Sequence, residues 1–449
     1  QPGHPPRQLL WPQASTPPAR HTPHTPPPAA RVPGRYQLHG FTFFAHLVPD
    51  TAVPALLPGT GWHRAEPVRG SDGRPVAAIW QHQDGSVFLP FDPGEAMHQF
   101  WSESYRTLGR SPLAAAARAA VLRGYYLTRP ALPRPLQIRL RRSLTRIQAR
   151  STFPAWPLDD SLHHLYEWLF TLTARLAGRP VPYLAPWPAG HTWALVLTHD
   201  VETAAGCHNI HLLREAERRL GYRSAWNFVP HRYQVTGDTL RALRAEGCEI
   251  GVHGLRHDGR DLASRKLLDK RLPVIRAYAR HWGADGFRSP ATQRAWDLMP
   301  RLGFAYDSSY PDTDPYEPQP GGCCTCLPYF NRNLVELPIT LPQDHTLYTI
   351  LATPDTTIWT RKARQLRDRH AMALTLTHPD YAHDPRVTTA YTQLLRTFAA
   401  DSTAWHALPA DVAAWWRHRA ASTLHPHGTT WAIHGPAATT GRIWLAEAG

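Results

Sequence analysis

The stretch that decides the fold is Ala194-Leu-Val-Leu-Thr-His-Asp-Val-Glu202, in which an apolar run ends at two carboxylates. Such a run predicts a buried β-strand. Farther along, Glu249-Ile-Gly-Val-His-Gly-Leu-Arg-His257 repeats the arrangement with two histidines at the strand end. One carboxylate and two imidazoles can bind a divalent metal ion, and a second carboxylate can act as a base for a water. The two stretches therefore predict a hydrolytic metal site.

From His191 onward, predicted strands and helices alternate. Strands are expected at 193–198, 224–229, 249–253, 286–288, 334–339, 372–376 and 404–407. Helices are expected at 208–220, 238–246, 261–281, 292–302, 387–400 and 410–419. This alternation predicts an α/β fold, a parallel sheet or barrel with outer helices, in which chemistry gathers at the carboxyl ends of the strands. Asp200, His253, Arg288 and His378 all follow predicted strands.

The rest of the chain is expected to add smaller pieces to this barrel at 191–420. Residues 1–34 are predicted to be a disordered Pro-rich tail, and 35–108 a small α+β domain of unknown role. Residues 109–190 are predicted to form a helical, Arg-rich connection, and 421–449 a short β-rich tail.

Residues 136–150 carry an apolar stripe within an arginine-rich helix. The stripe consists of Leu136, Leu140, Leu144 and Ile147. One interpretation is weak contact with an anionic surface. The other, which we favour, is a docked helix with a solvated basic face.

The overall composition does not indicate a nucleic-acid-binding, disulfide-rich or membrane protein. The net charge of +14 would suggest a nucleic-acid partner. However, nearly all the basic residues are arginine, and the chain is rich in Ala and Pro, a combination that coding bias produces. No nucleic-acid partner is therefore expected. The five cysteines do not suggest a disulfide framework. No apolar run could cross a membrane, and no signal peptide is visible. A cytoplasmic location is therefore slightly favoured.

Five motifs occur in a characteristic order. They are Asp200-x-Glu202, His253-x-x-x-His257, Arg288-Ser-Pro290, Asp307-Ser-Ser and Leu376-Thr-His378. This order resembles the polysaccharide deacetylase family, the NodB-homology group of carbohydrate esterases, over residues 191–420 or so. The resemblance implies an irregular (β/α)7 barrel that removes acetyl groups from an N-acetylated glycan or glycan precursor by attack of a metal-bound water.

The resemblance also implies a role for each motif. Asp200 would be the base, Arg288 its orienting partner, and His378 the general acid. The ligands of a divalent metal, with Zn²⁺ favoured, would be Glu202, His253 and His257. Contacts to the carbohydrate would come from Asp307, Pro290 and an aromatic residue, Tyr310 or alternatively Tyr316, and Asp307 would help to set His378.

Two departures from the family pattern leave alternatives open. Asp200-Val-Glu202 replaces two adjacent aspartates, and Ala291 stands where an aromatic residue is usual. One alternative is a catalytically inactive barrel that binds carbohydrate, with the many tryptophans as stacking surfaces. Another is an amidase acting on a small non-glycan amide. Neither a Gly-rich phosphate loop nor a G-x-S-x-G elbow is present.

Overall fold

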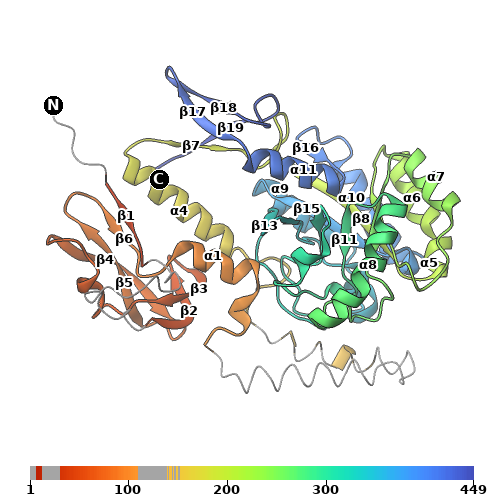
Figure 1. The fold of residues 1–449 in the computed structure, drawn as a ribbon, viewed down its shortest axis with the longest axis horizontal. Coiled ribbons are helices and arrows are strands. Elements are labelled where there is room, and N and C mark those ends of the chain that lie inside the picture. The colour runs from red at the N-terminus through yellow and green to blue at the C-terminus, as the bar shows by residue number, and fades with distance from the viewer. Residues whose placement is uncertain are drawn as a thin grey trace. The chain divides into compact units, whose positions relative to one another are not determined.

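The chain folds into two compact units (Figure 1). This computed structural model describes residues 7–12, 31–109, 139, 141–143, 145, 148, 149 and 152–448. The first unit comprises Gln1–Gly124, Asp160–Tyr183 and Trp444–Gly449, and the second comprises Tyr125–Asp159 and Leu184–Ile443.

A six-stranded sheet organises the first unit. Its strands, in spatial order, are β1 (Leu9–Leu10), β6 (Val87–Phe88), β5 (Pro75–His82), β4 (Trp62–Gly70), β2 (Val32–Leu38) and β3 (Phe41–Leu47). The unit also contains α1 (Pro93–Trp101) and α4 (Ser161–Ala177). Asp92 caps α1 by accepting the N–H groups of Gly94 and Glu95 at 2.8 and 3.2 Å.

The units divide the chain differently from the predicted domains. The predicted disordered tail, residues 1–34, contributes β1 and the start of β2; its residues 1–6 and 13–30 lie outside the described residues. Helix α4, expected in the connection 109–190, belongs to the first unit. Near the C-terminus, β19 (Ile443–Ala446) pairs with β7 (Val181–Leu184) rather than forming a separate tail.

A nine-stranded sheet organises the second unit. Its strands are β8 (Trp193–Val201), β9 (Ala225–Phe228), β10 (Glu249–His253), β11 (Gly286–Arg288), β12 (Tyr306–Asp307), β13 (Tyr329–Asn331), β14 (Leu334–Glu336), β15 (Met372–Thr377) and β16 (Ala404–His406). The order is β13-β14-β12-β11-β10-β9-β8-β15, with β16 also paired to β8. Neighbours run parallel except β13 and β14. This confirms the predicted α/β class.

The sheet curls so that its ends are linked. The N–H groups of Thr340 and Leu341, which follow β14, donate to the carbonyl of Leu374 on β15 at 3.3 and 3.0 Å. The sheet matches the predicted (β/α)7 barrel only in part, because it also contains the antiparallel strand β13 and the additional strand β16. The helix expected at 292–302 is absent; short 3-10 turns at Pro290–Thr292 and Met299–Leu302 replace it. Prolines and a left-handed backbone at Ala291 break the helical pattern there.

Helices connect most of the parallel strands. They are α5 (Ala204–His208), α6 (Ile210–Arg219), α7 (Gly237–Ala245), α8 (Arg265–Trp282), α9 (Ile358–Asp368), α10 (Pro385–Phe398) and α11 (Pro409–Ala420). Helix α8 begins later than expected because Ser264 caps it through the N–H of Leu267 at 3.2 Å. Strand β8 is buried along its whole length, as its apolar run predicts.

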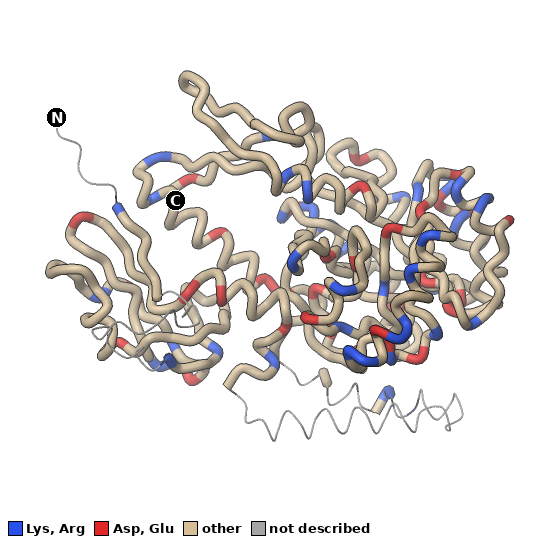
Figure 2. Tube along the Cα trace, viewed as in Figure 1, with Lys and Arg blue, Asp and Glu red and all other residues tan. Residues whose placement is uncertain are grey.

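The remaining sequence expectations concern the surface. A hairpin of β17 (Thr423–His427) and β18 (Thr430–His434) lies in the predicted β-rich tail. The apolar stripe within 136–150 lies outside the residues whose side chains are described, so its contact with an anionic surface stays a prediction. The described Arg142 of that segment donates to the carbonyl of Thr349 at 2.9 Å. In the view of Figure 2, basic residues lie among acidic ones around α6, α7 and α8. Among the described helices, none has the length and apolar character needed to span a membrane.

Candidate metal centre and active site

Strand β8 delivers the first two predicted site residues to one end of the sheet. Asp200 lies near the end of β8, and Glu202 directly follows it. Because side chains alternate along a strand, the neighbouring His199 points to the opposite face, where it contacts Thr377 and Glu217. The sequence pattern thus separates a catalytic candidate from a structural histidine within two residues.

Glu202, His253 and His257 converge as predicted from the sequence. One potential ligand atom from each lies within 4.8 Å of the others. His253 ends β10, and His257 lies in the following loop with a left-handed backbone (φ 54°). Glu202 therefore reaches the histidines although it stands one residue later and is one methylene longer than the usual family ligand.

The two imidazoles are oriented as metal ligands would be. His253 Nδ1 lies 3.1 Å from the carbonyl oxygen of Arg288, a contact that fixes the ring. The Nε2 atoms of His253 and His257 are buried, and among the described residues neither has an aligned hydrogen-bond partner, although Glu202 Oε1 is 2.8 Å from His257 Nε2. When Nδ1 donates to a carbonyl, Nε2 keeps its lone pair free for an ion. Two imidazoles and a carboxylate fit a divalent metal, with zinc as a good match.

Asp200 lies beside this cluster in a network of donors. Its Oδ1 accepts from Asn227 Nδ2 at 2.9 Å and lies 3.3 Å from Arg288 Nη1, while Oδ2 is 3.5 Å from His253 Nε2. Burial raises the pKa of Asp200, but its interactions with His253, the charged Arg288 and the amide of Asn227 together outweigh burial, so the net shift is downward. Asp200 is therefore kept ionised, as a base requires.

Arg288 is held rigidly for this task. Its Nη1 donates to Thr198 Oγ1 at 2.8 Å, and its Nε and Nη2 donate to the carbonyl and hydroxyl of Ser308 at 2.6 and 2.8 Å. The guanidinium thus links the ends of β8, β11 and β12 and orients Asp200.

His378 lies on the other side of the ligand cluster. Its Nε2 is 3.7 Å from Glu202 Oε1, and its Nδ1 is 2.6 Å from Asp344 Oδ1. Asp344 Oδ2 also accepts the main-chain N–H of His378 at 2.7 Å. Burial lowers the pKa of His378, but the Asp344 carboxylate more than compensates and raises it to about 10. His378 therefore carries a proton at neutral pH, as a general acid requires.

The loop that carries His257 is held by a buried arginine. Arg271 Nη1, on α8, donates to Asp258 Oδ1 at 2.8 Å and to Asp261 Oδ1 at 2.6 Å. The second oxygen of Asp261 accepts the N–H of Leu255 at 3.0 Å. The loop starts at Gly254 (φ 63°), where a side chain would lie only 2.6 Å from Asp261 and Pro290. The backbone around His257 is thereby fixed.

Asp307, expected to contact the carbohydrate, has a buried side chain. Its two oxygens lie 2.8 and 3.0 Å from the N–H and hydroxyl of Ser309. Burial raises the pKa of Asp307 to about 6, although its hydrogen bonds to Glu336 and Ser309 act in the opposite direction. The carboxylate 2.6 Å from His378 Nδ1 is that of Asp344, and the roles of Asp307 in contacting substrate and in setting His378 stay predictions.

The other two predicted substrate contacts are packed into the interior. Tyr310 lies against Trp296 and Tyr329, with Arg294 5.6 Å from its ring centre. Pro290 packs beneath Gly254. Their role as substrate contacts stays a prediction.

Sequence reasoning missed three residues of this site: Asn227, Asp344 and Asp380. Asp380 Oδ2 accepts the main-chain N–H of Glu202 at 3.0 Å, and Thr203 donates to the same carboxylate. Asn227 lies on β9 near its carboxyl end, so the rule that found Asp200 and His253 also indicates it. Asp344 caps the π-helix His345–Ile350, and Asp380 lies in the 3-10 turn Pro379–Tyr381, so neither ends a predicted strand.

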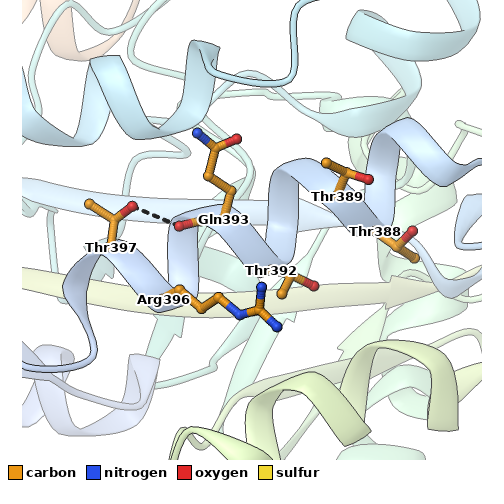
Figure 3. Close-up of a pocket in the computed structure, with 6 residues that line it drawn as sticks. All are labelled: Thr388, Thr389, Thr392, Gln393, Arg396 and Thr397. Atoms are coloured by element: carbon orange, nitrogen blue, oxygen red, sulfur yellow. Dashed lines mark hydrogen bonds between the residues drawn. The ribbon is translucent and has the colours of Figure 1, made fainter.

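A surface hollow on α10 lies apart from this cluster (Figure 3). Its lining consists of Thr388, Thr389, Thr392, Gln393, Arg396 and Thr397. It contains no carboxylate or imidazole, so it offers none of the ligand types found at Glu202, His253 and His257.

Comparison with known proteins gives matches only at the level of structure. No family model and no curated protein matches the sequence. A protein described as a polysaccharide deacetylase from Mycobacterium smegmatis has a TM-score of 0.44 and 20% identity, over 55% of this chain and 97% of that chain. PuuE allantoinase has a TM-score of 0.43 and 17% identity, over 53% of this chain and 94% of that chain.

A protein described as a polysaccharide deacetylase from Pseudomonas aeruginosa PAO1 has a TM-score of 0.43 and 17% identity, over 54% of this chain and 96% of that chain. Polysaccharide deacetylases are thus among the structures to which this chain is similar, as the motif order predicts.

Proposed function

We propose that the second unit is a metal-dependent hydrolase that removes acetyl groups from an N-acetylated glycan or glycan precursor, with Zn²⁺ as the favoured ion. The observation that carries this proposal is the convergence of Glu202, His253 and His257, whose imidazole Nε2 atoms are buried without an aligned hydrogen bond. Buried polar atoms in native structures are nearly always paired, so this pair of atoms indicates a missing ligand.

When bound, the ion would supply Lewis acidity to a water molecule and to the acetyl carbonyl. Asp200 is ionised and lies 3.5 Å from His253 Nε2, so it accepts a proton beside the ligands. His378 is protonated and lies 3.7 Å from Glu202 Oε1, so it donates a proton to the leaving nitrogen. Proton donation is essential for an amide, since an unprotonated amine is a poor leaving group. The acid and the base flank the ligands, which favours hydrolysis over binding alone.

The test is acetate release from N-acetylglucosamine oligomers, with and without chelator. The proposal predicts activity that chelator removes and added zinc restores. A purified protein that holds zinc but releases no acetate would favour the inactive carbohydrate-binding barrel. Acetate release from small non-sugar amides alone would favour the amidase.

A further inference from the structure

Glu202 is the first residue beyond the end of β8. The register of β8 with β15 ends at the pair His199 and Thr377, and its register with β9 ends at the pair Val201 and Phe228. In the family pattern of two adjacent aspartates, the second carboxylate would stand at position 201, inside the strand. In the described part of the chain, no strand pairing therefore fixes the main chain of Glu202.

A side chain from another segment takes the place of a strand partner for Glu202. Asp380 Oδ2 accepts the N–H of Glu202 at 3.0 Å, and Asp380 Oδ1 accepts the hydroxyl of Thr203. Thr203 Oγ1 in turn accepts the N–H of Gly206 at 3.1 Å and so caps α5. Because a main-chain N–H needs an acceptor when no strand supplies one, the carboxylate of Asp380 completes the end of β8.

The place of Asp380 depends on a glycine. A Cβ added to Gly206 would lie 2.5 Å from Asp380 Cγ and closer still to Oδ2. The carboxylate therefore lies directly against the main chain of α5, and a methyl group at position 206 would displace it. Gly206 and Asp380 thus form a fitted pair, although the sequence separates them widely.

The turn that carries Asp380 also carries the proposed acid. His378 directly precedes the 3-10 turn Pro379–Tyr381, in which Asp380 lies. His378 Nε2 is 3.7 Å from Glu202 Oε1. One short segment therefore holds both the acid and the carboxylate that fixes the main chain of Glu202.

We propose that Asp380 is a positioning residue, which holds the main chain of Glu202 at the place from which its side chain reaches the two histidine ligands. This inference rests on the proposed function and deepens it, because it explains how a carboxylate one residue later than usual serves as a ligand. The role requires an oxygen that accepts the N–H of Glu202, and it does not require the negative charge of Asp380.

The test measures the zinc affinity of the metal-free protein by competition with a chromogenic chelator. Asp380→Ala removes the acceptor, and Gly206→Ala displaces the carboxylate without changing its chemistry. We expect zinc affinity to fall between about 10- and 100-fold in both variants. Asp380→Asn keeps an oxygen that can accept the N–H of Glu202, so its zinc affinity should stay within about threefold of the wild-type value.

The absorption spectrum of the Co²⁺-loaded protein separates a displaced ligand from a general loss of stability, because it depends on the geometry of the ligands. The spectrum should change in Asp380→Ala and Gly206→Ala, and Asp380→Asn should restore it. Gly206→Ala carries the test if Asp380→Ala fails to fold, as thermal unfolding would show.

Asp384→Ala is the matched control. Asp384 is another carboxylate of the same segment, but the main-chain N–H that it accepts, at 2.9 Å, is that of Arg386. Its removal should lower stability and leave both zinc affinity and the Co²⁺ spectrum unchanged.

Three results would overturn the inference. Unchanged zinc affinity and an unchanged Co²⁺ spectrum in Asp380→Ala and Gly206→Ala would do so and leave the proposed function standing. An equal loss of affinity in Asp380→Asn would show that the charge of Asp380 acts rather than its contact with Glu202. A wild-type protein that binds no zinc would remove the proposed function and this inference with it.

Discussion

Two buried histidines of the second unit have opposite surroundings. Both ring nitrogens of His199 are paired, with Thr377 Oγ1 at 2.7 Å and Glu217 Oε1 at 2.6 Å. His253 has one nitrogen on a carbonyl and the other without an aligned partner. The first cluster is complete with protein atoms alone, whereas the second is incomplete. Burial alone therefore does not distinguish a structural histidine from a functional one. Whether both ring nitrogens have hydrogen-bond partners does distinguish them.

The cluster around His199 shows what a complete network contains. Glu217 accepts from Arg214, Ser224 and Tyr391 as well as facing His199. Trp226 stacks on the His199 ring with centroids 4.0 Å apart. The neighbouring residue Asp200 faces the incomplete cluster instead, so one strand supports both.

The largest effect should follow from removing Asp200, the proposed base beside the incomplete cluster. In Asp200→Asn the side chain keeps its size but can no longer accept a proton, so we expect acetate release to fall by roughly 10³-fold. Metal content should not change, because Glu202, His253 and His257 remain. Steady-state kinetics with metal analysis checks both. Substantial residual turnover would remove Asp200 from the role of base.

The complete cluster should respond in stability rather than in metal content. His199→Ala leaves the Glu217 carboxylate without one of its partners and opens a gap beside Trp226. We expect a loss of about 3 kcal/mol in the free energy of unfolding, with one zinc per chain retained. Denaturant unfolding and metal analysis measure the two quantities. Loss of zinc with unchanged stability would show that His199 serves the metal site rather than the stability of the fold.

The pH dependence of stability should reveal the pair of Asp344 and His378. The folded state raises the pKa of His378 from 6.5 to about 10, so the folded protein binds this proton more tightly than the unfolded chain. Its contribution to stability is present in full below pH 6.5 and is lost as the pH rises through about 10, at no more than about 1.4 kcal/mol per pH unit.

The measurement is denaturant unfolding of chelator-treated wild-type protein and of His378→Gln between pH 6 and 10. The stability difference between them should shrink as the pH rises. A constant difference would show that His378 is not protonated in the folded state.

The smallest effect should come from the loop that carries His257. Arg271→Met removes the contacts to Asp258 and Asp261, so the loop should hold His257 less firmly and zinc affinity should fall, by at most roughly tenfold. Arg265→Met is the matched control, because Arg265 lies on the same helix and contacts the exposed Asp269 at 3.7 Å. Competition with a chromogenic chelator measures both. An unchanged affinity in Arg271→Met would make this contact purely structural.

The sequence predicted most of the site because its residues lie at strand ends. The apolar runs of strands β8, β10 and β15 are strong enough to show where each strand ends. Asp200, His253 and His378 could therefore be placed at one edge of the sheet. Arg288 was found in the same way. The two-residue strand β12 is too short to give a pattern, and it was missed.

Pairings across loops could not be predicted in the same way. Asp344 lies next to His378 in space but far from it in the sequence, and no periodicity links a loop carboxylate to its partner. For the same reason the contact between Asp344 and His378 was not predicted. The order of strands and helices could be predicted from the sequence. The side-chain contacts between distant segments could not, because they depend on how the sheet curls.

Whether Glu202, His253 and His257 form a metal site can be measured by titrating zinc into the metal-free protein, with calorimetry to monitor binding. We expect one zinc per chain in the wild-type protein, one zinc in His199→Ala, and none in His253→Ala. Full zinc binding by His253→Ala, or no binding by the wild-type protein, would contradict it.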